Sequence, residues 1–181
     1  MSDQASKLFQ SVIWPAAAGN VAWSFFTVAL EDGVTQATIP KLAVLGLLSI
    51  YLGADWLMTE KLASSRKLRP YFWIADGALA AAIVTFAIAT QQMTLPEDHR
   101  WLTGSLVFVF AAAAVGHLFG AWEPVGHRNM RNRWILALAN LSGGIVILLR
   151  MYVFPGTGTW HLPGAVLMTL ICWAIARRWL V

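Results

Sequence analysis

The sequence predicts an all-α, polytopic membrane protein, a single domain built as a bundle of six transmembrane helices. Two observations carry this prediction. Of the 181 residues, 58% are hydrophobic and only 12% are charged, whereas soluble domains carry about 25% charged residues. The apolar residues also gather into stretches long enough to cross a bilayer core, which takes about 20 residues per helix. Because these stretches occupy most of residues 1–181, we expect one transmembrane domain and no soluble domain.

The predicted spans cover about 8–30, 39–60, 70–91, 100–122, 134–154 and 161–180. The first continues past Pro15 and Asn20 and is too long for the core of a cleaved signal peptide. Each later span follows a connector in which Gly or Pro breaks the helical pattern. In order, the connectors read "EDGVTQATIP", "SSRKLRP", "QQMTLPEDHR", "EPVGHRNMRNR" and "FPGTGTWHLPG".

The charge of the connectors predicts the orientation. Lys and Arg collect in short cytoplasmic loops, and here the basic clusters fall in the second connector, the fourth connector and the C-terminus: Lys61, Arg66, Lys67, Arg69, Arg128, Arg131, Arg133, Arg177 and Arg178. The first connector is acidic. We therefore expect a multi-pass protein of the cell (inner) membrane with both termini cytoplasmic. The net charge of +4 then reflects topology, and we expect no nucleic-acid partner.

Small residues and deep tryptophans bear on helix packing. Small-xxx-small spacing lets helices approach closely, and it occurs at Ala18 with Ala22 and at Gly116 with Gly120. The adjacent pair Gly143 and Gly144 is a third position with small residues. This favours a compact bundle, or a contact with a second copy or a partner membrane subunit. Three tryptophans, Trp14, Trp23 and Trp173, fall deep in their spans, where they pack against neighbouring helices or line a ligand cavity.

Polar residues on four predicted spans fall at nearly one depth near the cytoplasmic side. Asp55 is six residues before Lys61 and His117 six before Glu123, or about 9 Å at 1.5 Å per residue. Asp76 is seven residues beyond Arg69, and Asn140 seven beyond Arg133. Ionisable residues inside a span usually face the interior and pair, so these four are the candidate coupling or binding residues. Asn20, on the first span, is a fifth candidate that would line a path toward them.

Two carboxylates and an imidazole suit three kinds of chemistry. They can carry a proton, since a histidine titrates near neutrality and neighbouring carboxylates share protons. They can bind a cation, although they fall short of a closed four-ligand zinc site. They can also act as general acid and base on a lipid head group, with Arg128 or Arg131 attracting its phosphate. An inert polar clamp between helices is the plain structural alternative.

The motifs that would identify a cofactor or a nucleophile are not found in the sequence. A haem held by two histidines needs both within the membrane. Only His117 falls inside a predicted span, whereas His99, His127 and His161 fall in connectors or at span ends. The single cysteine, Cys172, excludes an intramolecular disulfide. The chain contains no HExxH, GxSxG or P-loop sequence. We therefore expect no cofactor.

Three functions follow from these observations. The first is a small transporter or channel-like subunit that uses the polar residues for proton or cation coupling and moves a small solute or ion. The second is a membrane-embedded enzyme acting on a lipid or isoprenoid substrate at the cytoplasmic leaflet. The third is a non-catalytic subunit that packs against partners in a larger membrane complex. We favour the first, because intramembrane ionisable residues are functional by default.

Overall fold

The computed structural model describes the protein at residues 9–63, 70–92, 99–121, 127–153 and 160–178, with side chains at 11–54, 74–91, 100–119, 131, 133–153 and 160–175. Its elements are a short π-helix, η1 (Phe9–Ile13), followed by α2 (Trp14–Glu31), α3 (Ile39–Ala63), α4 (Pro70–Gln92), α5 (His99–Ala121), α6 (His127–Val153) and α7 (His161–Arg178). All the secondary structure in these ranges is helical, which confirms the all-α class.

Proline marks the start of four helices. Pro15, Pro40, Pro70 and Pro163 lie in the first turns of α2, α3, α4 and α7, where the missing N–H costs no helical hydrogen bond and the fixed φ suits the helix. The end of α2 has the opposite signal. Gly33 follows the C-cap residue Asp32 and has a φ of +72°, the left-handed conformation that stops a helix and that glycine adopts without strain.

Helix α6 begins before the span that its hydropathy predicts. The sequence places residues 127–133 in a connector, whereas the structure makes them the first two turns of α6. Arg and Met are good helix formers, and a helix can run beyond the hydrocarbon layer into water. The apolar span itself begins at Arg133 and ends at Val153.

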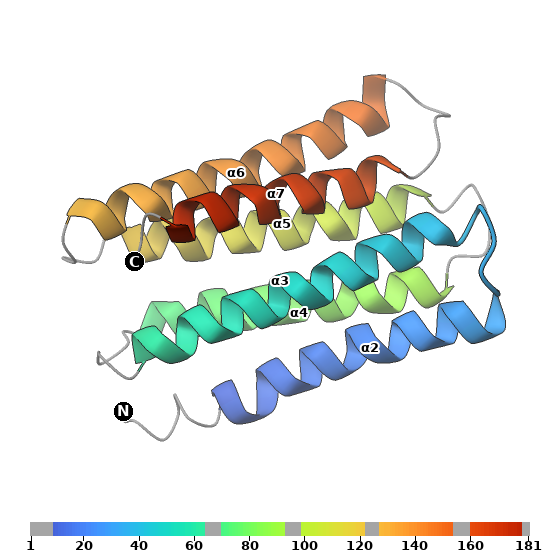
Figure 1. Ribbon diagram of the computed structural model, residues 1–181, viewed down its shortest axis with the longest axis horizontal. Coiled ribbons are helices and arrows are strands. Elements are labelled where there is room, and N and C mark those ends of the chain that lie inside the picture. Colours follow the sequence, from blue (N-terminus) through green and yellow to red (C-terminus); the bar gives the residue numbers. More distant parts are fainter. Residues whose placement is uncertain (1–8, 64–69, 93–98, 122–126, 154–159, 179–181) are drawn as a thin grey trace.

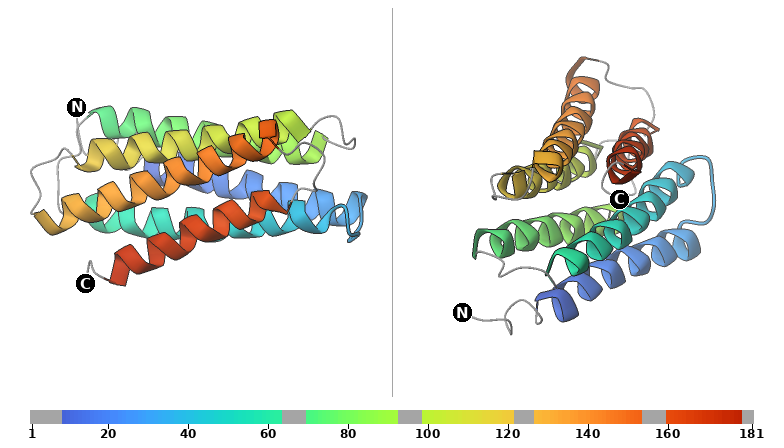
Figure 2. Two further views of the ribbon diagram at one scale, coloured as in Figure 1. Left: turned by 90° about the horizontal axis from the view of Figure 1, so that it is seen from above. Right: turned by 60° about the vertical axis from the view of Figure 1, so that its left-hand side comes forward.

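The six α-helices form a closed ring in two layers (Figures 1 and 2). One layer holds α2, α3 and α4, and the other holds α5, α6 and α7. The principal contacts run from α2 to α4, then to α5, α6, α7 and α3, and back to α2. Helices consecutive in sequence alternate in direction, so the start of α2 and the end of α7 lie at the same end of the bundle (Figure 1).

Four of these helices are long and apolar enough to cross a membrane, with spans at Ser11–Glu31, Ile74–Gln91, Arg100–Phe119 and Arg133–Val153. Within the described residues, α3 and α7 contribute shorter apolar stretches, Ile39–Ala54 and His161–Ile175. These helices are compatible with a membrane-embedded protein.

The ring has an inner core and two outward-facing helices. Side chains from all six helices meet in the core, where Phe86, Leu45 and Leu106 are among the largest that are fully buried. In α5, 56% of the apolar span is buried, against 28% in α2 and in α6. The outer faces of α2 and α6 expose large apolar side chains such as Trp23, Leu138 and Leu149, as expected of surfaces that meet lipid.

Candidate functional site

His117 lies near the end of α5 and is buried, with 7% of its surface exposed. The preceding residue, Gly116, faces α4, because a Cβ added there would lie 3.8 Å from the Cβ of Ala75. The two helices are therefore in van der Waals contact beside His117. Since α5 is the most buried of the four candidate spans, its imidazole is set inside the bundle, as predicted for an ionisable residue within a span.

Asp76 directly follows Ala75 on α4, so the contact between Ala75 and Gly116 brings Asp76 and His117 to one level of the bundle. Asp76 is half-buried, and it interacts with another group of the protein. On the next helix of the ring, Arg133 of α6 is within electrostatic range of His117. Three neighbouring helices thus bring an acid, an imidazole and a guanidinium to the same end of the bundle.

Asn140 on α6 is 1% exposed. Its Nδ2 donates a hydrogen bond of 2.8 Å to the carbonyl oxygen of Leu136, one turn earlier. Its Oδ1 is buried and has no hydrogen-bond partner among the residues that the structure describes. A buried acceptor without a donor costs free energy, so the Oδ1 of Asn140 is a place where a donor from water, a solute or a neighbouring side chain would bind favourably.

Asp55 lies in α3, but its side chain is outside the described residues. The preceding residue, Ala54, packs against Leu136 of α6 and Trp173 of α7. That cluster places α3, one residue before Asp55, at the level of the turn before Asn140. It also assigns Trp173 to packing between helices, the simpler of the two roles expected for the deep tryptophans.

The structure gives Asn20 a local bond. Its side chain is half-buried, and its Nδ2 donates 2.9 Å to the carbonyl oxygen of Ala16 on the same helix. One turn later, Ser24 is fully buried, and its Oγ accepts a hydrogen bond of 2.6 Å from Nε2 of Gln91. This bond ties α2 to α4 far from the candidate polar layer, and the sequence interpretation did not single out Gln91.

The arginines proposed for a lipid phosphate lie in the first turns of α6. Arg131 is exposed, whereas the side chain of Arg128 is outside the described residues. Within the described ranges, no three His, Cys, Asp or Glu side chains come together in a group that could hold a metal ion. Cys172 on α7 is a free, half-buried thiol.

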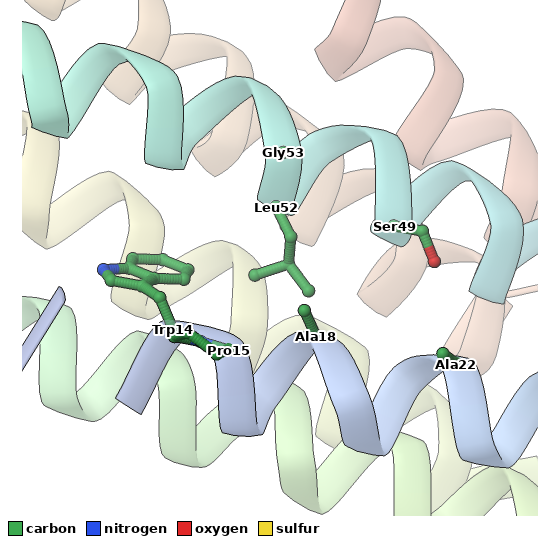
Figure 3. Close-up of a pocket in the computed structure, with 7 residues that line it drawn as sticks. All are labelled: Trp14, Pro15, Ala18, Ala22, Ser49, Leu52 and Gly53. Atoms are coloured by element: carbon green, nitrogen blue, oxygen red, sulfur yellow. The ribbon is translucent and has the colours of Figure 1, made fainter. Parts of the chain in front are cut away.

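A separate hollow of about 340 Å³ lies between α2 and α3, and Figure 3 shows its lining. Helix α2 supplies Trp14, Pro15, Ala18 and Ala22, and α3 supplies Ser49, Leu52 and Gly53. The residues that line the hollow are uncharged and all belong to α2 and α3. The hollow therefore shares no residue with the surroundings of His117. Trp14 is the one tryptophan among the residues that line this hollow.

Fold and site together define the class, an all-helical protein whose apolar helices suit a membrane and whose core holds a buried histidine. Comparison with known proteins adds no family. No family model, no curated protein and no solved structure matches the sequence.

Proposed function

We propose that the protein is a small integral membrane transporter or channel-like subunit that couples movement of a proton or cation to a polar layer formed by Asp55, Asp76 and His117. All six α-helices would cross the cell (inner) membrane, with both termini cytoplasmic. The alternating helix directions support this topology, because the ends of α3 and α5, which precede the basic connectors in the sequence, lie on the same side as the start of α2 and the end of α7 (Figure 1).

The observation that carries the proposal is the burial of His117 beside the contact between α4 and α5. Placing an ionisable group inside apolar helices is costly, and such residues mark ion pathways and proton relays. The contact between α4 and α5 at this level is made by Ala75 and Gly116. A carboxylate one residue along α4, at Asp76, supplies a second group that can exchange a proton at the same level.

Asp55 belongs to the proposed layer on the sequence argument, since it lies six residues before Lys61. Its helix reaches this level one residue earlier, where Ala54 packs against Leu136 and Trp173. Asn140 completes the layer with a buried acceptor that can bind a hydrated cation or a water molecule. The layer thus combines proton-accepting groups with a neutral oxygen ligand.

Proton flux into liposomes tests the proposal. Purified protein is reconstituted around a trapped pH-sensitive dye, and an imposed membrane potential drives proton entry. We expect flux above that of protein-free liposomes, and a loss of about tenfold or more in Asp76→Asn, which keeps the size of the side chain but removes its proton-accepting charge. His117→Gln is expected to act in the same direction.

The matched control is Thr85→Val, which lies on the same helix as Asp76, is exposed and bonds only to the carbonyl of Ala81 at 2.8 Å among the contacts described. It should leave the flux unchanged. The same liposomes with an inward sodium or potassium gradient and an ion-sensitive dye cover the cation case. Wild-type flux equal to that of empty liposomes in every gradient, or flux indifferent to Asp76→Asn, would refute the coupling role.

A further inference from the structure

Asn140 keeps a buried hydrogen-bond acceptor that the described part of the chain leaves unused. Its side chain is 1% exposed, and its Oδ1 has no hydrogen-bond partner among the residues that the structure describes. The Nδ2 of the same amide donates to the carbonyl oxygen of Leu136, which turns the amide toward the start of α6. Because a buried acceptor without a donor costs free energy, a donor small enough to enter the bundle would bind there favourably.

The packing of α5 against α6 sets this amide beside His117. A Cβ added at Gly144 would lie 3.6 Å from the Cβ of Phe110, so these two residues face each other. The two helices run in opposite directions (Figure 1), and steps of four and seven residues return to one face of a helix. Four residues back along α6 lies Asn140, and seven residues on along α5 lies His117. The two residues therefore face one interface, about 4.5 Å apart in level.

Alanines line the interface between these two polar residues. Ala113 and Ala114 on α5 and Ala137 on α6 are each at most 2% exposed. Helical side chains lean toward the start of their own helix, so the imidazole of His117 leans toward the level of Asn140, and the amide leans toward the level of the imidazole. The polar ends therefore converge between short side chains. The Oδ1 of Asn140 still receives no hydrogen bond from the imidazole, which leaves a place for one small bridging group.

A single water molecule matches the chemistry of this place. It can donate one hydrogen to the Oδ1 of Asn140 and bind the imidazole of His117 with its other hydrogen or with its oxygen, so it fits both the neutral and the protonated ring. Buried waters make two to four hydrogen bonds, and a carbonyl oxygen of the preceding turn of α5 has a second lone pair for a third. An anion cannot use an acceptor. A bare cation would find far fewer than the six or more oxygen ligands that Mg²⁺ and Ca²⁺ take.

Polar residues lead to this place from the end of the bundle where α6 begins. Asp76 and Arg133 are half-buried, so each borders the surroundings of the bundle as well as its interior. Arg133 lies one turn before Ala137 on α6 and is within electrostatic range of His117. The amide of Asn140 points toward the same end of the bundle. Water entering between these groups meets polar partners along its way, which an apolar wall does not offer.

We propose that His117 and Asn140 hold one buried water molecule between α5 and α6, and that this water accepts the proton of His117. The N–H bond of the protonated imidazole breaks, and a lone pair of the water oxygen forms the new O–H bond. Asn140 acts as a positioning residue, because its Oδ1 accepts a hydrogen bond from the same water and keeps the water oxygen turned toward the ring. The proton transfer rests on the proposed function, whereas the water site does not.

X-ray radiolytic labelling tests the water site without any transport. Brief irradiation of the full-length protein in liposomes forms hydroxyl radicals from bound water, and mass spectrometry locates the oxidised residues. We expect oxidation of His117. Asn140→Leu keeps the approximate size of the side chain but removes the acceptor, so this oxidation should fall about fivefold or more, because the water loses one of its two side-chain partners. The matched control is Ser105→Ala, also on α5, which removes a buried hydroxyl already bonded to the carbonyl oxygen of Leu102 at 2.9 Å; it should leave the oxidation unchanged.

A second variant removes the space and keeps both polar groups. Ala114→Val adds two methyl groups at the interface, and it should lower the oxidation of His117 to a similar extent. Wild-type oxidation that is absent, or that is indifferent to both Asn140→Leu and Ala114→Val, would overturn the water site even where wild-type liposomes carry protons.

Proton flux in the same liposomes separates the site from the transfer. A flux that falls together with the oxidation in Asn140→Leu supports both parts of the proposal. An unchanged flux in a variant that has lost the oxidation would overturn the transfer from His117 to this water. Oxidation that depends on Asn140 in a protein without any flux would refute the proposed function and support the water site.

Discussion

Small residues do opposite things at two helix contacts of this bundle. Where α5, α6 and α7 meet, Gly143 is packed so tightly that an added Cβ would lie 3.2 Å from Cε1 of Phe110 and 3.3 Å from Oγ1 of Thr169. Between α2 and α3, an added Cβ at Gly53 would touch nothing within 4 Å. A glycine in one contact makes room for a neighbouring ring, whereas in the other it leaves a hollow. Small residues in an apolar helix therefore permit a close approach without enforcing one.

The largest expected effect comes from removing the ring that the tight contact accommodates. Phe110 is 3% exposed, and Phe110→Ala should lower the free energy of unfolding by about 3 kcal/mol, the lower end of the range for a buried phenylalanine. Unfolding in mixed micelles of mild detergent and SDS measures the loss. The control is Phe26→Ala on α2, whose side chain is 59% exposed. Equal losses in both variants would mean that the buried ring of Phe110 contributes no more to stability than the exposed ring of Phe26.

A smaller loss is expected from overfilling the same contact. Gly143→Leu should cost about 2 kcal/mol in the same assay, because Phe110 and Thr169 must move to admit the side chain. The double variant Phe110→Ala with Gly143→Leu sharpens this test. If the leucine occupies the space that the ring vacates, the double variant loses less than the sum of the two single losses. Strict additivity would contradict the direct contact that the structure shows.

The smallest effect, and one of opposite sign, belongs to the loose contact. Gly53→Ala should raise the free energy of unfolding by about 0.5–1 kcal/mol, because alanine favours the helix over glycine and its methyl group meets open space. Gly143→Ala provides the comparison, since there the helical gain is set against crowding at 3.2 Å. A loss of stability in Gly53→Ala would show that another molecule already occupies the hollow between α2 and α3 under the conditions of the measurement.

Hydropathy predicts the helices well because it depends on composition along one dimension. The six predicted stretches coincide with α2 to α7 to within a few residues at most ends, and the main departure is α6, which starts at His127. That start was missed because Arg and Asn lower the hydropathy without opposing the helix. The burial of His117 and Asn140 could also be predicted without knowing which helices pack together, since polar groups inside a span avoid lipid.

Features that depend on which helices meet were beyond the sequence. The bond from Gln91 to Ser24 joins residues 67 positions apart, and nothing in either local pattern names the other partner. The hollow between α2 and α3 was also beyond the sequence. Ala18 and Ala22 have the small-xxx-small spacing of a close helix contact, yet they line an open space. The level of Asp76 relative to His117 was estimated only from distance to the span ends, whereas the contact between Ala75 and Gly116 gives it directly.

The way the ring closes has a consequence for how the protein is made. Helix α3 contacts α2 on one flank and α7 on the other, but α7 is synthesised only after α4, α5 and α6. One flank of α3 therefore lacks its final partner for most of synthesis. The residues near that flank, including Ala54 with its cluster of Leu136 and Trp173, can pack only when the bundle is nearly complete. Final assembly of the level that holds the polar residues is thus tied to the arrival of α7.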